Sequence, residues 1–306
     1  METTERDEEL EGCPSDTGEI GRASVCEGCP GRALCLSQGQ ADPEQEKLDL
    51  RMKAIAHKIL VLSGKGGVGK SSVAANLAVA LSRKGKKVAL LDVDICGPSI
   101  PKLMNVEGAQ VIASDYGWIP PKDPVHNIPV MSVQFLLGHP DAPVVWRGPR
   151  KTSMIKRFLK DTFWGRLDYL IVDTPPGTSD EHLSTITALK NAKPDGAVIV
   201  TTPQKVSLVT INKELSFCKK LKLPVLGLIE NMSGFVCPCC EECTDIFCRD
   251  GGAEELAQQQ RLPFLGRIPL DPRMGLCAER GESVLDKHPQ SPCEQAFAAV
   301  VDALCK

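Results

Sequence analysis

A glycine-rich segment between an apolar run and a helical stretch restricts the fold more than any other feature of the chain. The segment SGKGGVGKSS spans residues 63–72 and fits the pattern GxxxxGK[ST] from Gly64 to Ser71. KILVLS, residues 58–63, precedes it as an apolar run, and SVAANLAVALSRKG, residues 72–85, follows it with helical spacing. A strand, a glycine-rich turn and a helix in this order form the context in which backbone amides cradle phosphate groups.

The remainder of the chain repeats this alternation of apolar runs and helical stretches. Runs rich in Val, Ile and Leu recur at residues 87–94, 128–133, 167–176, 195–203, 223–231 and 262–269. Continuous apolar strands that alternate with helices are typical of a parallel sheet covered on both faces. We therefore predict an α/β fold of the P-loop NTPase type, a mostly parallel sheet flanked by helices. Ligands of such sheets bind at the carboxyl ends of the strands.

Residues 1–50 differ in composition from the rest of the chain. They contain 13 acidic and 4 basic residues and carry a charge of −9, whereas the remainder carries +6. They are poor in large aliphatic side chains, so they cannot bury enough apolar surface to become ordered without a metal centre. We predict a small cysteine-rich, iron–sulfur-binding extension over residues 1–50, an ATPase domain over residues 51–306, and a linking helix over residues 44–56.

Hydropathy and charge argue against several classes of protein. No apolar run approaches the ~18 residues that a membrane span needs, and METTERDEELEG at the amino terminus has no apolar core of a signal peptide. The chain also lacks a dense block of Lys and Arg. We expect a cytoplasmic protein, or one shared between cytoplasm and nucleus, that binds neither nucleic acid nor membranes.

The glycine-rich segment defines the predicted nucleotide site. The glycines that would turn backbone N–H groups toward phosphate oxygens are Gly64, Gly66, Gly67 and Gly69. Lys70 would reach the β and γ phosphates, Ser71 would ligate Mg²⁺, and Ser72 would contact the α phosphate. The amino end of the following helix adds a favourable potential for anions.

Carboxylates at two other predicted strand ends complete this site. Asp173 closes the apolar run of LIVDTPPGTSD, where it can hold Mg²⁺ through water. Asp92 and Asp94 lie in LLDVDICGPS; one can join the Mg²⁺ water network and the other can orient the attacking water. The alternative is that they are solvated carboxylates. No NKxD guanine motif occurs, which favours ATP over GTP.

Together KGGVGK, DVDICGPS and DTPPGT resemble the deviant-Walker branch of the P-loop ATPases, which includes the nitrogenase iron protein and the Min-type and ParA-type ATPases. The resemblance implies a dimer whose nucleotides face each other and whose ATP hydrolysis is slow. It implies that Lys65 crosses the interface to the partner's phosphates, Asp94 orients water, Asp173 is associated with Mg²⁺, and Asn231 contacts the adenine. A cation delivered by the partner would make hydrolysis depend on pairing of the protomers.

The chain contains 14 cysteines, which in a reducing compartment point to metal or iron–sulfur ligation where they cluster. The first cluster has the spacing C-x12-C-x2-C-x5-C and consists of Cys13, Cys26, Cys29 and Cys35. Four thiolates can enclose one [4Fe–4S] cluster or one tetrahedral Zn²⁺, and the spacing alone does not decide between them. The isolated cysteines are expected to be small buried hydrophobes: Cys218, Cys277, Cys293 and Cys305.

The second cluster begins with a CPxC motif, Cys237 and Cys240, shortly after Asn231. Two thiolates are half of what a [4Fe–4S] cluster needs, and a two-fold dimer would supply the other pair. The segment CPCCEECTDIFC holds five cysteines between residues 237 and 248, however. A zinc site made by four of these within one chain therefore remains open.

With DICGPSIPK, WRGPRK and PPGTSDEH, the whole chain resembles the cytosolic iron–sulfur cluster assembly scaffolds of the Mrp/nucleotide-binding-protein family, in particular members with an amino-terminal ferredoxin-like extension. The resemblance implies an ATP-dependent scaffold that builds [4Fe–4S] clusters and transfers them to apoproteins. Its cofactors would be ATP, Mg²⁺, one cluster in each amino-terminal extension and a second that bridges a dimer. Its partners would be a second copy or, in a heterotetramer, a shorter paralogue, together with recipient apoproteins and cluster-targeting factors. The alternatives are a ParA/Min-like switch with structural zinc sites, an ATP-driven reductase and a zinc-stabilised ATPase.

Overall fold

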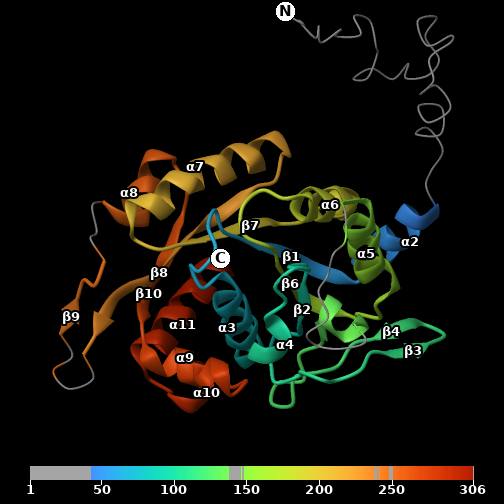
Figure 1. Ribbon diagram of the computed structural model, residues 1–306, viewed down its shortest axis with the longest axis horizontal. Coiled ribbons are helices and arrows are strands. Elements are labelled where there is room, and N and C mark those ends of the chain that lie inside the picture. Colours follow the sequence, from blue (N-terminus) through green and yellow to red (C-terminus); the bar gives the residue numbers. More distant parts are fainter. Residues whose placement is uncertain are drawn as a thin grey trace, which may run out of the picture. The chain divides into compact units, whose positions relative to one another are not determined.

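The computed structural model describes residues 43–137, 146, 148–237, 240, 242–247 and 251–305 (Figure 1). The chain divides into two units, Met1–Lys47 and Leu48–Lys306. Six of the cysteines discussed above lie outside the described residues: Cys13, Cys26, Cys29, Cys35, Cys239 and Cys248.

The main sheet has the strand order β10-β8-β7-β1-β6-β2-β5, and its neighbouring strands are all parallel. The short strand β9 pairs antiparallel with the end of β8, and β3 and β4 form a separate hairpin. The strands are β1 (Ile55–Leu62), β2 (Val88–Asp92), β3 (Ile112–Ser114), β4 (Gly117–Ile119), β5 (Val130–Met131), β6 (Leu167–Asp173), β7 (Gly196–Thr201), β8 (Val225–Val236), β9 (Cys243–Thr244) and β10 (Phe264–Leu270). The predicted α/β fold with a mostly parallel sheet is confirmed.

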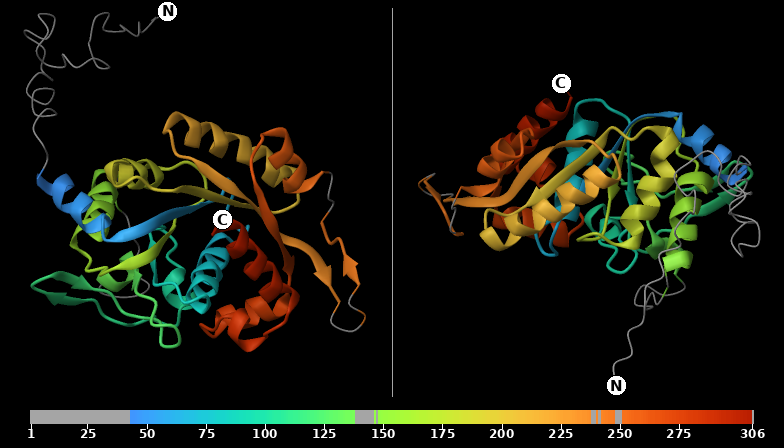
Figure 2. Two further views of the ribbon diagram at one scale, coloured as in Figure 1. Left: turned by 180° about the vertical axis from the view of Figure 1, so that it is seen from behind. Right: turned by 90° about the horizontal axis from the view of Figure 1, so that it is seen from above.

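Helices cover both faces of this sheet (Figure 2). The helices are α2 (Pro43–Met52), α3 (Lys70–Arg83), α4 (Ile100–Leu103), α5 (Gly148–Asp161), α6 (Asp180–Leu189), α7 (Lys205–Lys220), α8 (Gly252–Gln259), α9 (Pro272–Glu279), α10 (Val284–Lys287) and α11 (Pro292–Leu304). Side chains of α3, α4 and α9–α11 belong to one buried cluster, and those of α5–α8 belong to another. No helix in the described part of the chain is long and apolar enough to cross a membrane.

Successive residues of the central strand point to opposite faces, which explains why it reads as one unbroken apolar run. In β1, Ile59 and Val61 contribute to the first cluster, whereas Leu60 and Leu62 contribute to the second. Both faces are therefore dry, and a polar residue in the interior of the strand would be costly to bury.

The structure corrects two predicted boundaries and adds one hairpin. The linking helix predicted over residues 44–56 ends at Met52, because the chain enters β1 at Ile55 and pairs with Leu167 of β6. The strand predicted over 223–231 continues to Val236 as β8, since β10 and β9 provide further pairing partners. The hairpin β3–β4 was not predicted because its three-residue strands are too short to show a periodic pattern.

Candidate functional site

The glycine-rich segment connects β1 to α3. Glycine is required at Gly69 by the backbone angle and at Gly64 by the close approach of another element. Gly69 precedes α3 with φ of 80°, a left-handed value, and a side chain there would collide with the amide of Asn231. A side chain on Gly64 would lie 2.5 Å from the hydroxyl of Thr210, in the first half of α7. These contacts place the loop against β8 on one side and α7 on the other, as a phosphate-binding turn at the start of a helix requires.

Lys70 and Ser71 converge on Asp173. The Lys70 Nζ atom lies 2.5 Å from Oδ1 of Asp173, and the Ser71 hydroxyl donates to Oδ2, also at 2.5 Å. Asp173 is fully buried, and burial raises the pKa of its carboxyl although Lys70 and Ser71 act in the opposite direction. A cation and a hydroxyl held by one buried carboxylate, at the foot of a phosphate loop, can exchange this partner for phosphate and Mg²⁺.

The two other candidate carboxylates differ sharply in environment. Asp92 lies beside Asp173 in the neighbouring strand and is fully buried. Burial and the charge of Asp173 hold the pKa of Asp92 well above its usual range, while its oxygens accept bonds from the Ser132 hydroxyl and the Asp94 amide. Asp94 is partly exposed, and its Oδ1 accepts from Gly97 N–H at 3.2 Å. Of the pair, Asp94 is the carboxylate that solvent can reach.

Lys65 stands apart from this network. Its side chain is exposed, as are the adjacent Gly66 and Gly67, and it forms no hydrogen bond or ion pair with any described residue. The described contacts therefore reveal no role for Lys65 within one copy of the chain. In contrast, Lys70 is 6% exposed and pairs inside the fold.

A cavity of about 250 Å³ opens beside the phosphate loop between β8, β10 and α9. Gly69 and Ser72 line one side, and Asn231 and Met232 line another. Its remaining walls are largely apolar, from Pro269, Leu270, Pro272, Met274 and Ala278. Asn231 donates its Nδ2 to the carbonyl of Val68 at 2.8 Å, which leaves its Oδ1 as an acceptor. A flat base with an exocyclic amine, such as adenine, suits an apolar slot with this acceptor.

Strand β8 lines the cavity with Asn231 and Met232 and leads to the cysteines, and it contains a bulge between the two. From the pair Asn231–Ile268 to the pair Phe235–Leu270, β8 advances four residues while β10 advances two. Within the bulge Met232 and Gly234 have φ of 54° and 75°. Bulges near sheet ends reorient side chains locally, and here the bulge separates Asn231 from the cysteine-bearing tip.

Glu230 fixes this bulge from inside the protein. It is fully buried, and its oxygens accept from the Ser233 hydroxyl at 2.6 Å and from Ala253 N–H at 2.7 Å. Arg267 approaches the same carboxylate at 3.4 Å. Glu230 thereby joins the bulge of β8 to the start of α8, the helix that follows the cysteine segment.

The described cysteines of the second cluster lie in a hairpin at the end of β8. Phe235 pairs with Thr244, Val236 pairs with Cys243, and Cys237 N–H donates to the carbonyl of Glu242. Cys237 is half-buried, whereas Cys240 and Cys243 are exposed. Among the described residues, no group of three or more His, Cys, Asp and Glu side chains is arranged to hold a metal ion. Cys237 and Cys240 are thus accessible, but the described part of one chain does not provide a full ligand set.

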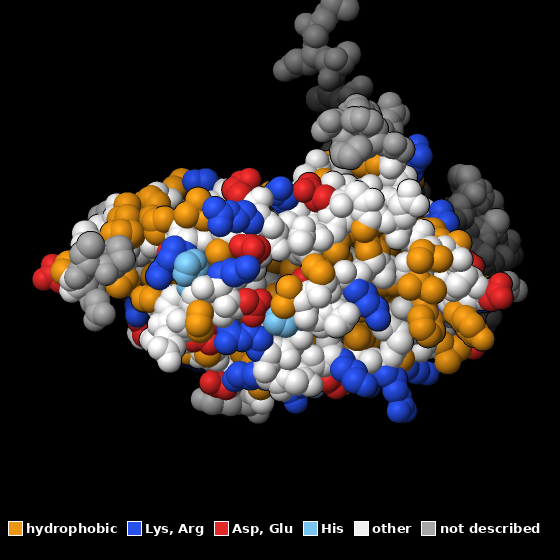
Figure 3. Space-filling model, turned by 90° about the horizontal axis from the view of Figure 1, so that it is seen from below, with side chains coloured by type: hydrophobic (Ala, Val, Ile, Leu, Met, Phe, Trp, Pro, Cys, Tyr) orange, Lys and Arg blue, Asp and Glu red, His pale blue; other side chains and the backbone are white. Residues whose placement is uncertain are grey.

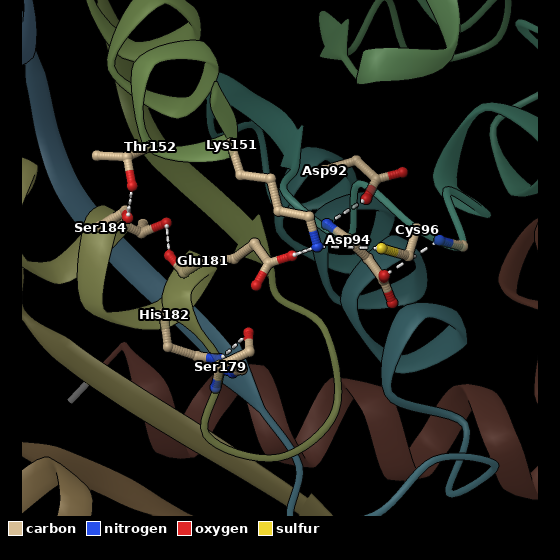
Figure 4. A network of polar contacts seen from close by, with 11 residues as sticks. Asp92, Asp94, Cys96, Lys151, Thr152, Ser179, Glu181, His182 and Ser184 are labelled. Atoms are coloured by element: carbon tan, nitrogen blue, oxygen red, sulfur yellow. Dashed lines mark hydrogen bonds and ion pairs between the residues drawn. The ribbon is translucent and has the colours of Figure 1, made fainter. Parts of the chain in front are cut away.

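A polar network joins three motifs that are far apart in the sequence (Figure 4). Lys151 of α5 lies 2.6 Å from Oε1 of Glu181 in α6 and 3.2 Å from Sγ of Cys96, two residues after Asp94. The hydroxyls of Thr152 and Ser184 are 2.7 Å apart and join the same two helices. The motifs DICGPS, WRGPRK and PPGTSDEH therefore meet at the carboxyl end of β2 and β6.

Burial and the contact with Lys151 shift the pKa values of two residues in this network. Burial opposes ionisation of Glu181, yet hydrogen bonds from Lys151 and Ser179 lower the pKa of its carboxyl. His182, next along α6, is fully buried and burial lowers its pKa to about 4, so it is neutral at physiological pH. Its Nδ1 accepts from the Ser179 backbone and caps α6.

The structure brings eleven of the predicted nucleotide-site residues to one edge of the sheet: Gly64, Gly66, Gly67, Gly69, Lys70, Ser71, Ser72, Asp92, Asp94, Asp173 and Asn231. It keeps Lys65, Cys237 and Cys240 at exposed or half-buried positions outside this network. Lys151, Glu181 and Glu230 were not among the predicted site residues. Nothing in the sequence marks them, because their burial and their partners depend on the packing of different elements.

Comparison with known proteins agrees with this geometry. The family model for ParA-related NUBPL iron-transfer P-loop NTPases matches residues 54–305. A nucleotide-binding protein from Archaeoglobus fulgidus, solved with ADP, is 41% identical with a TM-score of 0.70, covering 80% of this chain and 94% of that one.

Two more distant structures share the fold alone. The septum site-determining protein MinD from Pyrococcus horikoshii, solved with Mg-ADP, is 24% identical with a TM-score of 0.59, covering 82% of this chain and 96% of that one. A ParA-family ATPase from Chlorobium tepidum is 21% identical with a TM-score of 0.55, covering 81% and 98%. The extent of the family match, over the whole ATPase region, shows that the chain belongs to the NUBPL iron-transfer P-loop NTPase family.

Proposed function

We propose that this protein is a cytosolic ATP-dependent scaffold that assembles [4Fe–4S] clusters and transfers them to apoproteins. One observation carries the proposal: a single strand, β8, bears Asn231 in the cavity beside the phosphate loop and leads directly to Cys237, six residues after Asn231, in a hairpin. Nucleotide binding and cargo binding thus share one structural element. The family's iron-transfer activity supports iron as the cargo.

The cargo site needs thiolates from two protomers. Cys237 and Cys240 provide two thiolates, whereas a [4Fe–4S] cluster takes four. A symmetric pair of chains would supply the rest and leave the shared cluster exposed enough to be passed on. The identity of the second chain, a copy or a shorter paralogue, does not alter this count.

The nucleotide face supports such pairing. Lys65 extends from this face without a described partner. Val206 and Val209 are exposed on the turn of α7 that leads to Thr210, which lies against Gly64. An exposed cation for the partner's phosphates and exposed apolar side chains suit an ATP-dependent interface. ATP would bind with its phosphates on Lys70 and Ser71 and supply the free energy of the γ-phosphate bond.

Anaerobic reconstitution with ferrous iron and sulfide tests the proposal. Carrying it out in a Cys26→Ser/Cys29→Ser background removes the predicted amino-terminal cluster from the signal. We expect absorbance at about 400 nm and about four iron atoms for every two chains, with dimers on size exclusion. Cys237→Ser/Cys240→Ser should abolish this signal, and Cys243→Ser, a matched control in the same hairpin, should retain it.

Two results would argue against the scaffold. Colourless protein that binds one zinc per chain would indicate a structural zinc site. Protein that stays monomeric with ATP and free of iron would remove the basis for a bridging cluster. Transfer is tested separately, by adding an apoprotein that gains activity only with a [4Fe–4S] cluster.

A further inference from the structure

A second cleft lies at the opposite edge of the sheet from the phosphate loop. Its volume is about 480 Å³, and it lies where β2 and β6 begin, at Val88 and Leu167. The nucleotide-site carboxylates, Asp92 and Asp173, end these same two strands. The length of the parallel strands therefore separates the two sites, and an occupant of one does not touch the other.

Four cations border this cleft and have no anionic partner. They are Lys86, Lys87, Lys122 and Arg166, all exposed, and their side chains form no ion pair or hydrogen bond with any described residue. The nearby carboxylates are already engaged: Asp286 pairs with His126 at 2.8 Å, and Asp168 accepts from Lys87 N–H at 2.7 Å. The cleft thus carries an excess of positive charge, because its four Lys and Arg side chains outnumber these two carboxylates, in a chain whose net charge is negative.

Large apolar side chains surround the same cleft. Phe163 and Ile119 line it and are 45% and 38% exposed. Tyr116 and Ile112 continue the apolar surface along the β3–β4 hairpin and are 74% and 63% exposed. Figure 3 shows hydrophobic side chains gathered beside Lys and Arg side chains on this face. An apolar patch rimmed by charges of one sign is typical of a protein-interaction site.

A buried hydrogen-bond donor in the wall of the cleft also favours an occupant that provides acceptors. Trp164 lines the cleft and is 3% exposed, yet its indole N–H has no acceptor among the residues that the structure describes. Buried indole N–H groups usually find a partner, so an orphan donor marks a place where an acceptor can bind. The indole of Trp164 and the four cations therefore favour an anionic occupant that is rich in hydrogen-bond acceptors.

We propose that this cleft and the β3–β4 hairpin form a docking surface for an acidic segment of a partner protein, in which carboxylates flank a bulky apolar side chain. The four cations would pair with the carboxylates, and the apolar side chain would pack against Phe163 and Ile119. A protein segment fits better than a small anion, because the exposed apolar surface extends beyond the cleft to Tyr116 and Ile112. The proposal is independent of the cargo that the protein carries.

The test is selection from a random peptide library displayed on phage, with the full-length chain immobilised. We expect enrichment of Asp and Glu around an aromatic or aliphatic residue. The selected peptide, labelled for fluorescence anisotropy, should bind Lys122→Glu/Arg166→Glu about tenfold or more weakly, with binding that weakens as salt rises. Phe163→Ala should also weaken it. Lys213→Glu/Lys220→Glu, a matched reversal on the exposed face of α7, should bind normally.

Several outcomes would overturn the proposal. Selection without an acidic consensus, or equal binding by Lys122→Glu/Arg166→Glu, would mean that the cleft does not recognise acidic segments. Displacement of the peptide by inorganic phosphate or by a DNA duplex at lower concentration than by unlabelled peptide would reassign the site to those anions. ATP hydrolysis by Lys122→Glu/Arg166→Glu should equal that of the wild type, and this readout establishes that the variant is folded.

Discussion

Asn231 donates a hydrogen bond of 2.8 Å from its side chain to the carbonyl of Val68, and this contact ties strand β8 to the phosphate loop. The bond is buried, and it fixes the amide so that its oxygen remains available to the base cavity. A single side chain thereby contacts the loop, lines the cavity and belongs to the strand that leads to Cys237. This relationship has consequences that nucleotide binding can test.

Asn231→Ala should weaken ATP binding by about tenfold, because it removes the base acceptor and leaves the Val68 carbonyl without its side-chain donor. It should also reduce the preference for ATP over GTP, since an acceptor at this position favours the C6 amino group of adenine over the C6 carbonyl of guanine. Titration calorimetry with both nucleotides measures the effect. Asn212→Ala, on the exposed side of α7, is the control. Unchanged affinity and selectivity in Asn231→Ala would exclude the assigned contact.

Lys65 and Lys70 should give different phenotypes when each is replaced by alanine. Lys70 pairs with Asp173 inside the fold, so Lys70→Ala should lose ATP binding by one protomer and, with it, iron loading at Cys237 and Cys240 in cells. Lys65 is exposed, so Lys65→Ala should bind ATP normally but fail to dimerise with ATP or hydrolyse it. Equilibrium binding and light scattering separate the two steps. Normal hydrolysis by Lys65→Ala would show that pairing does not depend on this lysine.

The ion pair between Lys151 and Glu181 should contribute measurably to stability, because Glu181 is 5% exposed and Lys151 is 17% exposed. Lys151→Met leaves a nearly buried charge without a partner and should lower the free energy of unfolding by about 2 kcal/mol at neutral pH. Lys151→Met/Glu181→Gln should recover part of the loss in a double-mutant cycle. Lys156→Met on the same helix is the control.

The pH dependence of this pair has a definite sign. Because the pKa of Glu181 is lowered in the folded chain, its contribution is present above its ordinary value of 4.5 and is lost as the pH falls below it. The Lys151→Met penalty should therefore shrink on acidification, as denaturant unfolding at several pH values would show. A penalty that is constant from neutral pH to pH values below 4.5 would rule out an electrostatic origin.

Glu214 in α7 should destabilise the folded chain as the pH rises, whereas Glu181 stabilises it. It is 1% exposed, its Oε2 has no hydrogen-bond partner within the described ranges, and burial raises its pKa to about 7. A carboxyl with a raised pKa opposes folding increasingly as the pH rises from its ordinary value of 4.5 to about 7. Glu214→Gln should therefore gain stability over the wild type as the pH rises, by on the order of 3 kcal/mol across that range. A pH-independent difference would show that Glu214 does not titrate with folding.

The sequence predicted what depends on local pattern. Gly64 to Ser71 identified the phosphate loop because its spacing reflects backbone geometry within one turn, and the apolar runs identified the strands because both faces of the sheet are covered. The different environments of Asp92 and Asp94 could not be read from the sequence, because they depend on the neighbouring strand that places Asp173 beside Asp92.

The burial of the isolated cysteines likewise could be predicted only in part from the sequence. Cys218, Cys277 and Cys293 are buried as predicted, whereas Cys305 is exposed near the Tyr169 hydroxyl, since α11 ends there and no element covers it. The pairing of Lys151 with Glu181 was invisible for a related reason: the two residues lie 30 positions apart on different helices. Contacts between elements are set by packing, which residue spacing does not encode.

The tip that holds Cys237 and Cys240 is joined to its neighbour β9 by two ladder pairs, Phe235–Thr244 and Val236–Cys243, and it lies beyond the last residue of β8 that pairs with β7, Glu230. Insertions, deletions or additional thiols in this hairpin would leave the register of the central strands unchanged. Evolution can therefore alter the size and chemistry of what the tip accepts while the nucleotide machinery behind it stays the same.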